Sequence, residues 1–357
     1  MQHVKLGILG AGAAARRIHL PGLRLCPDVE VAAICDPDRG AAESSGIPDV
    51  YTRYQDLLAR QDLDAVIVAA PNHLHRELAL AVIAAGKHVL CEKPLALNFA
   101  EATAMRMAAE AAGIVHMTAF TYRYCPAFRY LDHLVSTGAL GEIRSVRAAY
   151  LMAMAQHLHG WRSSRLLAGS GVLADVGSHL IHLALTAAGP IVSLTAHQRR
   201  FRDDPSSDVE DWVGFLARFA GGACGTFEIS RVCPGRGAGM WENIHLEVYG
   251  TEGSAVFWSR DTRALQVALG ADARDPGRLL ERIEAPREFW KLPGAPRDEN
   301  AGDPLWDYRY DQAFQFVANV RSGRPAAPTF ADGASCQAVL DAVLRSAETG
   351  GWVGVEA

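Results

Sequence analysis

The chain has 357 residues, of which 49% are hydrophobic and 21% are charged, and its formal net charge is −5. A single core stops growing at about 250–300 residues, so this length indicates two domains, and the apolar content excludes a disordered chain. The acidic balance argues against nucleic-acid binding, which needs a basic surface.

The seven cysteines are odd in number, and none lies in a Cys-x-x-Cys pair. This pattern favours free thiols in a reducing compartment over a disulfide framework, so a cytoplasmic protein is predicted. The amino-terminal apolar run is short and leads directly into a glycine turn, unlike a signal peptide. No apolar run approaches the ~20 residues that span a bilayer, and no membrane association is expected.

The first part of the chain alternates short apolar runs with helical patterns, which is typical of a parallel sheet with crossover helices. Pro21 and Gly22 are expected to end the first helix. Asn98 is expected to cap the fourth helix, with Glu101 completing a capping box. The predicted strands are residues 4–9, 29–35, 65–70, 88–91 and 114–120, and the predicted helices are 13–20, 54–60, 75–85 and 99–112.

The later part shows alternating runs separated by glycine-rich turns, as an antiparallel sheet requires. Residues 260–304 are rich in proline, glycine and charge and are expected to form a loop with a short helix. The predicted strands are residues 143–151, 192–201, 211–219, 223–229, 244–249 and 254–258, and the predicted helices are 126–137, 308–322 and 333–348.

A glycine turn follows the first predicted strand and opens the first helix with the pattern G-x-G-x-x-A. Gly10 permits the tight turn, Gly12 lets the backbone approach a pyrophosphate, and Ala15 lets the helix pack on the strand. Asp36 ends the second strand 21 positions after Ala15, where a carboxylate binds a ribose diol and repels a 2′-phosphate. NAD is therefore predicted, with NADP less favoured. The predicted site comprises Gly10, Gly12, Ala13, Ala14, Ala15 and Asp36.

Further segments follow in a recognisable order over essentially the whole chain. They are APNHLH at 70–75, AGKHVLCEKP at 85–94, FTYRYCP at 120–126, WR at 161–162, GVLADVGSH at 171–179 and GTEGS at 250–254. Together they resemble the glucose–fructose oxidoreductase / inositol dehydrogenase (Gfo/Idh/MocA-like) family. The resemblance implies more cofactor contacts, at Pro71, Asn72, His75, Glu92, Lys93, Trp161 and Arg162. The predicted substrate site comprises Lys93, Tyr122, His157, His159, Asp175, His179 and His182, of which the resemblance itself implies Lys93, Asp175 and His179.

The resemblance further implies a catalytic group of Lys93, Asp175 and His179. Hydride transfer from a hydroxyl-bearing carbon requires the hydroxyl proton to leave, and a positioned acid/base group assists that step. Within a helix Asp175 and His179 would share one face. We expect His179 to be the acid/base, Lys93 to polarise the substrate oxygen and Asp175 to orient both, but the sequence leaves the roles of Lys93 and His179 exchangeable.

One departure from the family pattern is His182, at a position where an Asp is common. His179, His182 and Asp175 together also admit a metal interpretation, to which His157 and His159 could add ligands. Histidines three positions apart on a helix are common without metal, so no metal site is predicted. Residues 156–162 are equally compatible with a pocket wall and a solvated loop.

The predicted fold is therefore α/β. An amino-terminal Rossmann domain with a doubly wound parallel sheet, residues 1–121, binds the dinucleotide. An α+β domain with a large, mostly antiparallel open sheet, residues 122–357, binds substrate and forms a homodimer or homotetramer, and the terminal helices can pack back on the first domain.

The predicted activity is NAD-dependent hydride transfer at a secondary alcohol or ketone carbon of a sugar, inositol or polyol. The main alternative is a lyase or glycoside-cleaving enzyme that recycles tightly bound NAD. A reductase of non-sugar substrates and an NAD-sensing regulatory protein are further alternatives. The regulatory alternative is weakest, because such a protein is expected to lose Lys93 or His179.

Overall fold

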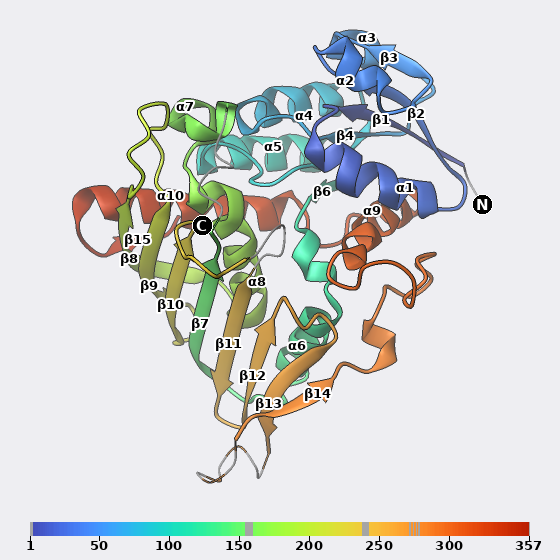
Figure 1. The fold of residues 1–357 in the computed structure, drawn as a ribbon. Helices are drawn as coiled ribbons and strands as arrows, with labels where there is room; N and C mark the ends of the chain where they lie inside the picture. The colour runs from blue at the N-terminus through green and yellow to red at the C-terminus, as the bar shows by residue number, and fades with distance from the viewer. Residues whose placement is uncertain are drawn as a thin grey trace. The chain divides into compact units, whose positions relative to one another are not determined.

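The computed structural model describes residues 3–153, 160–237, 243–270, 273, 275, 277 and 279–356. The chain forms two compact units, each with its own sheet (Figure 1). The first unit comprises Met1–Thr121, Leu292–Gly302 and Arg309–Gln337. The second comprises Tyr122–Lys291, Asp303–Tyr308 and Ala338–Ala357.

The first unit contains a six-stranded parallel sheet in the order β3-β2-β1-β4-β5-β6. This is the strand order of a Rossmann fold, so the fold prediction for this part is confirmed. The strands form because their apolar runs are buried on both faces, as in β4, where every side chain is enclosed. They are β1 (Val4–Leu9), β2 (Val29–Cys35), β3 (Asp49–Tyr51), β4 (Ala65–Val68), β5 (His88–Cys91) and β6 (His116–Thr118).

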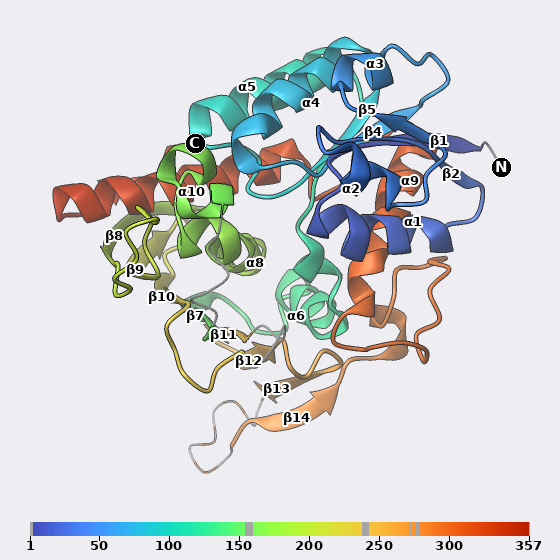
Figure 2. The same ribbon diagram turned by 45° about the horizontal axis from the view of Figure 1, so that its top comes forward.

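Helices cover both faces of this sheet (Figures 1 and 2). On one face α4 and α5 pack together and bury Leu78, Val82 and Met105 in one core with Val66 and Val89. On the other, α1 packs on α9. As predicted, the Asn98 side chain caps α5 by accepting from the N–H of Glu101 at 2.9 Å. The helices are α1 (Leu20–Leu25), α2 (Arg39–Glu43), α3 (Tyr54–Leu58), α4 (His75–Ala84), α5 (Phe99–Ala111) and α9 (Asp311–Ser322).

The expectation that Pro21 and Gly22 end the first helix is wrong, because helical structure continues to Leu25. A π-helical turn, Ala15–His19, precedes α1 and ends with Leu20 donating to the carbonyl of Ala15. Pro21 thus lies in the first turn of α1, where no backbone donor is needed. Gly22 brings α1 close to α9, since a Cβ there would lie 3.0 Å from that of Ala313.

The second unit contains a nine-stranded sheet in the order β14-β13-β12-β11-β7-β10-β9-β8-β15. Only the β7–β10 pair is parallel among the described pairings, so the predicted mostly antiparallel sheet is confirmed. The strands are β7 (Ile143–Leu151), β8 (Ile191–Arg199), β9 (Trp212–Phe219), β10 (Cys224–Ser230), β11 (Ile244–Gly250), β12 (Gly253–Trp258), β13 (Ala264–Leu269), β14 (Glu281–Glu284) and β15 (Val353–Gly354).

The expected loop at 260–304 is a wrong prediction, because β13 and β14 lie within it. These strands extend one edge of the sheet by pairing in turn with β12. The short run of β13 alternates only weakly, and β14 has the sequence Glu-Arg-Ile-Glu, so backbone pairing rather than an apolar pattern defines both. Edge strands with charged side chains are common, since charge discourages further pairing.

Helices α6 (Pro126–Ser136) and α8 (Ser178–Ala188) pack side by side on one face of this sheet, as Figure 2 shows. The sheet residues under them, among them Val146 and Leu246, are fully buried. Because side chains alternate along a strand, the opposite face carries Arg147, Leu216 and Glu247. The short α7 (Arg165–Ala168) precedes α8, and α10 (Phe330–Thr349) runs from the first unit's residues into the second's.

The segment Arg165–Ala188 is long and apolar enough to cross a membrane by length and composition alone. This corrects the expectation that no run would approach that size. However, 78% of its most apolar window is buried inside the protein, which is the property of a core helix.

Candidate active site

The glycine turn lies between β1 and the first helix of the first unit. Gly10 has a φ of 103°, and a Cβ there would lie 2.4 Å from the carbonyl oxygen of Ala69. Only glycine fits this position. A Cβ on Gly12 would meet nothing within 4 Å, so the turn leaves open space beside the helix amino terminus. Because the first amides of a helix lack intrahelical partners, this arrangement suits a bound pyrophosphate.

The other residues of the turn differ in exposure. Gly12 and Ala13 are exposed, and Ala14 is half-buried. Ala15 is fully buried, which agrees with a close contact between helix and strand. The turn therefore presents its backbone outward and its small side chain inward, and these residues fit a dinucleotide.

Asp36 lies at the carboxyl end of β2 and is half-buried. One carboxylate oxygen accepts from the N–H of Ala11 at 2.8 Å, and the other accepts from that of Asp38 at 2.9 Å. The carboxylate thus fixes the glycine turn to the end of β2, next to the position where a ribose would lie.

Glu92 and Lys93 follow β5. The Glu92 carboxylate is nearly buried, with one oxygen 2.8 Å from Nε2 of His19 and the other accepting from the N–H of Lys93 at 3.2 Å. Burial acts to raise the pKa of Glu92, but the hydrogen bond from His19 and the charge of Lys93 outweigh it, so the pKa lies below its usual value. Glu92 is therefore an anion that holds the backbone of half-buried Lys93.

Three other predicted cofactor residues lie where β4 leads into α4. Pro71 is extended and half-buried, and Asn72 is 5% exposed. His75 is fully buried, with Nδ1 2.8 Å from the carbonyl oxygen of Pro94 and Nε2 2.9 Å from that of Ala70. Both ring nitrogens of His75 are thus occupied by backbone groups.

In the second unit Asp175 and His179 lie on one continuous helical stretch. Asp175 belongs to a π-helical turn, Leu173–Gly177, and His179 lies at the start of α8. The predicted separation of four residues therefore crosses a π-turn rather than regular α-helix. Such turns are rare and occur often at functional sites. Lys93, the third predicted catalytic residue, belongs to the first unit.

The sequence did not reveal Arg231, which pairs with the carboxylate of Asp175. Its side chain is 2% exposed, and burial lowers the pKa of the guanidinium to about 10, so it is a cation at neutral pH. A buried cation beside Asp175 favours the carboxylate form and fixes its direction. Arg231 directly follows β10, and no local motif distinguishes it.

Tyr122 and His179 pack edge to face, with ring centroids 4.8 Å apart and planes at 77°. The Tyr122 hydroxyl lies 3.1 Å from that of Tyr150, a residue of β7 that the sequence also did not reveal. Tyr122 and Tyr150 are fully buried, whereas His179 is 7% exposed. This packing fixes the plane of the His179 imidazole.

The remaining predicted residues of the second unit differ in setting. Trp161 and Arg162 are half-buried, and the guanidinium of Arg162 lies 4.2 Å from the centroid of the Trp161 ring. His182 is 2% exposed, and burial together with Arg123 holds its pKa well below its usual value, so it is a neutral, enclosed imidazole. His157 and His159 lie outside the described residues.

Among the described residues, no group of three or more His, Cys, Asp or Glu side chains is arranged to hold a metal ion. Asp175, which the metal interpretation required, is paired with Arg231. A cation beside the carboxylate competes with a metal ion for it. The arrangement therefore fits a carboxylate that acts through hydrogen bonds and charge.

Comparison with known proteins identifies the same two parts. A model described as an oxidoreductase family with an NAD-binding Rossmann fold matches residues 4–120, and a model of the GFO/IDH/MocA C-terminal domain matches residues 128–256. Levoglucosan dehydrogenase of Pseudarthrobacter phenanthrenivorans is 31% identical, with 99% of each chain covered. The 1,5-anhydro-D-fructose reductase of Ensifer adhaerens is 33% identical over 70% of this chain and 74% of its own.

Solved structures agree. A levoglucosan dehydrogenase in complex with NADH and levoglucosan has a TM-score of 0.89 at 30% identity, with 100% of both chains covered. The model that matches the Rossmann unit shows the class, which is that of the NAD-binding oxidoreductases. Within that class the chain belongs to the Gfo/Idh/MocA family, as its sequence motifs predicted.

Proposed function

We propose that the protein is an NAD-dependent dehydrogenase that transfers hydride between the nicotinamide and a secondary alcohol or ketone carbon of a cyclic sugar or related polyol. The observation that carries the proposal is the full-length similarity to levoglucosan dehydrogenase, together with the Asp175–Arg231 pair on the helix of His179. Bound NAD supplies the hydride acceptor. Levoglucosan and similar anhydrosugars are the first substrates to test.

The proposed proton path uses the charges described above. His179 takes the proton from the substrate hydroxyl, because a neutral imidazole nitrogen accepts a proton and the plane of its ring is fixed by Tyr122. Asp175, kept anionic by Arg231, accepts hydrogen bonds from substrate hydroxyls and orients the imidazole. Lys93 stabilises the negative charge that develops on the substrate oxygen.

Contacts of the cofactor are part of the same proposal. Gly10, Gly12, Ala13, Ala14 and Ala15 hold the pyrophosphate, and Asp36 binds the adenosine ribose. The segments with Pro71, Asn72 and Glu92 flank the nicotinamide side, and Trp161 and Arg162 are further proposed cofactor contacts. Substrate contacts are assigned to Tyr122, His157, His159 and His182, although burial of Tyr122 and His182 argues for an indirect role of both.

The activity is tested by mixing the purified protein with NAD and a panel of anhydrosugars, aldoses, sugar acids, inositols and glycosides. We expect NADH absorbance to rise with a cyclic sugar, and the oxidised sugar to appear in equal amount by chromatography. Consumption of a glycoside that requires NAD but releases no NADH would instead identify the recycled-cofactor enzyme. No turnover of any sugar, with NAD bound, would contradict both.

We also propose a cytoplasmic homo-oligomer that assembles through the open face of the nine-stranded sheet. None of the seven cysteines, all of which lie within the described residues, forms a disulfide, as suits a reducing compartment. Leu216 is 48% exposed on that face, and a large sheet face with apolar residues is typical of an interface.

Light scattering of Leu216→Glu tests this assembly. We expect a smaller particle than wild type, because a buried charge opposes association. Leu25→Glu, at a 44% exposed leucine in α1, is the matched control and should leave the mass unchanged. A wild-type monomer would contradict the proposal.

A further inference from the structure

His75 connects the ends of two neighbouring strands of the first unit. The residue begins α4, and its imidazole is fully enclosed. Nδ1 lies 2.8 Å from the carbonyl oxygen of Pro94, two residues beyond Glu92 in the segment after β5. Nε2 lies 2.9 Å from the carbonyl oxygen of Ala70, in the segment after β4. One rigid ring therefore spans the two segments that are assigned to the cofactor and to Lys93.

The two contacts of the His75 ring cannot both be hydrogen bonds when the ring is neutral. A carbonyl oxygen only accepts hydrogen bonds, and a neutral imidazole donates from one nitrogen. Burial lowers the pKa of His75, although the two carbonyls and Glu92 act in the opposite direction. The neutral ring holds one carbonyl firmly and leaves a lone pair facing the other. Which nitrogen carries the proton therefore decides which segment the ring fixes.

Lys93 is already held from the other direction. Its own N–H donates to the Glu92 carboxylate at 3.2 Å, and that carboxylate is 2.8 Å from Nε2 of buried His19. The carbonyl of Pro94 is the next backbone acceptor along the chain after the carbonyl of Lys93 itself. A donor at that carbonyl fixes the segment on the far side of Lys93.

We propose that His75 is a positioning residue whose Nδ1–H holds the Pro94 carbonyl and thereby sets the direction of the Lys93 side chain. The ring acts on the reaction through Lys93 and makes no contact of its own with cofactor or substrate. This inference rests on the proposed function of Lys93. A misplacement of about 1 Å at such a group costs on the order of 100-fold in rate, so the effect is measurable.

Two amide variants separate the contacts of the ring. In His75→Asn the side-chain N–H₂ can take the place of Nδ1 and keep the bond to Pro94. In His75→Gln it can take the place of Nε2 and keep the bond to Ala70. Both variants place one neutral amide in the same enclosed site, so they share any general cost of the substitution. Their unfolding free energies, measured by urea titration, check that equality.

We expect kcat to fall by about 100-fold in His75→Gln and by less than about tenfold in His75→Asn. KM for the sugar and Kd for NAD are expected to change little in either variant. Equal losses of kcat in the two variants at equal stability, or a larger loss in His75→Asn, would overturn the proposal. A loss that appears only in Kd for NAD would also overturn it, because it would make His75 a cofactor residue.

A second measurement keeps the inference distinct from the proposed function. In ¹⁵N-edited NMR spectra of histidine-labelled protein, the wild type should show a slowly exchanging Nδ1–H that His75→Gln removes. A ring protonated only at Nε2 would overturn the proposal, whatever the kinetics. If Lys93→Ala retained full turnover while the Nδ1–H signal was present, the role of Lys93 would fail and the hydrogen bond to Pro94 would stand.

Discussion

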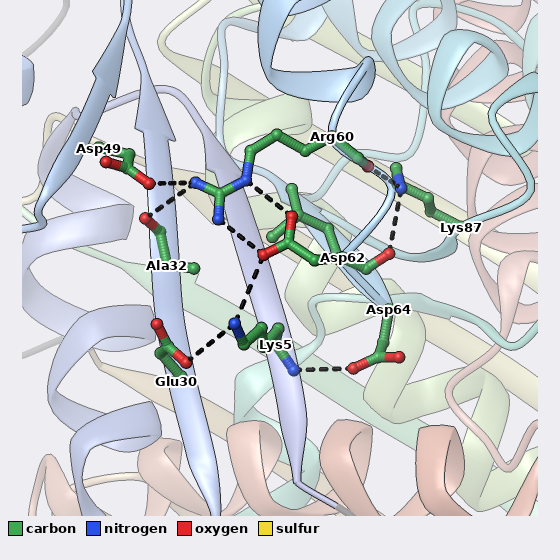
Figure 3. Close-up of polar contacts among 9 residues, drawn as sticks. Lys5, Glu30, Ala32, Asp49, Arg60, Asp62, Asp64 and Lys87 are labelled. Atoms are coloured by element: carbon green, nitrogen blue, oxygen red, sulfur yellow. Dashed lines mark hydrogen bonds and ion pairs between the residues drawn. The ribbon is translucent and has the colours of Figure 1, made fainter.

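The six-stranded sheet has an amino-terminal edge, where its parallel strands begin, and a carboxyl-terminal edge, where they end. Both edges carry polar side chains, but the hydrogen-bond partners of these side chains differ. At the amino-terminal edge, charged side chains pair with one another (Figure 3). Arg60 forms two bonds with the carboxylate of Asp62, at 3.0 and 2.8 Å, and also pairs with Asp49. Lys5 lies 3.4 Å from Asp62 and 3.6 Å from Glu30.

At the carboxyl-terminal edge, side chains mainly hold backbone groups. Asp36 binds the amide of Ala11, Glu92 binds that of Lys93, and His75 faces two carbonyls. Ion pairs among side chains leave the direction of the main chain free, whereas bonds to amides and carbonyls fix it. Backbone contacts also occur at the amino-terminal edge, where Asp64 accepts from the N–H of Lys5 at 2.8 Å and Lys87 donates to two carbonyls. The difference is that this edge adds a network of ion pairs, whereas the edge with the proposed site uses these side chains mainly to orient the main chain.

The sharpest test of this difference is Lys93→Ala. We expect kcat to fall by about 10²–10⁴-fold, because a charge that stabilises the developing oxyanion is lost. Kd for NAD, measured by fluorescence titration, should stay within about fivefold of wild type, since a partly exposed charge contributes at most about 1 kcal/mol. Lys93→Arg keeps the charge and should recover part of the rate. A wild-type kcat in Lys93→Ala would contradict the proposed role of Lys93 in catalysis.

The next largest effect is expected for Asp36→Ser. Loss of the carboxylate should weaken the preference for NAD, so the ratio of the Kd for NADP to the Kd for NAD should fall by about 10–100-fold. The reason is that a charged hydrogen bond contributes about 1.5–3 kcal/mol. Asp38→Ser is the matched control, since Asp38 caps α2 by accepting from the N–H of Ala41 and serine is also a good cap. An unchanged ratio in Asp36→Ser would show that another residue selects the cofactor.

Substitutions at the amino-terminal edge are expected to lower the free energy of unfolding and to leave kcat unchanged. Lys87 is 5% exposed and donates from Nζ to the carbonyls of Arg60, at 2.6 Å, and Leu63, at 3.0 Å. Lys87→Met should lower the free energy of unfolding by about 1–3 kcal/mol, because these carbonyls lose their donor. Lys5→Met, whose partners are exposed, should cost less than about 1 kcal/mol. A loss of kcat at saturating substrate in Lys87→Met would break the comparison.

The smallest expected effect is on acid stability. Hydrogen bonding to Arg60 lowers the pKa of Asp62. A carboxyl whose pKa is depressed on folding stabilises the protein above its unfolded pKa, and that contribution is lost as the pH falls through the folded value. The difference in unfolding free energy between wild type and Arg60→Gln should therefore narrow below about pH 4. A constant difference from pH 7 to pH 3 would contradict the pairing.

Most strands and helices of the first unit and its glycine turn were predictable because they depend on local patterns, whereas the short α2 and β3 were not predicted. The cap of Asn98 and the buried Ala15 follow from neighbours in sequence. The helix end predicted at Pro21 was wrong because a π-turn lies before this residue. The proline therefore falls in the first turn of α1, where its missing N–H is not needed, and α-helical spacing in the sequence does not reveal this. The strands β13 and β14 were missed because an edge strand is defined by its pairing partner.

The candidate site was predictable only in part for the same reason. Lys93, Asp175 and His179 were found through their motifs, and their roles stay predictions. Arg231 and Tyr150 were missed because their importance arises from contacts with residues more than 25 positions away. Sequence placed His75 beside the cofactor, whereas its setting is an enclosed ring between two carbonyls.

The two π-turns, Ala15–His19 and Leu173–Gly177, have a consequence for how such chains can vary. A π-turn holds one residue more than the α-turn it replaces, so it absorbs an insertion while the helix faces on either side keep their direction. Asp175 and His179, four residues apart across such a turn, correspond to a spacing of about three in an unbroken helix. Insertions and deletions usually fall in loops, but here a change of one residue can fall within the two helices next to the proposed site. Alignments of relatives should therefore allow a one-residue gap at each π-turn.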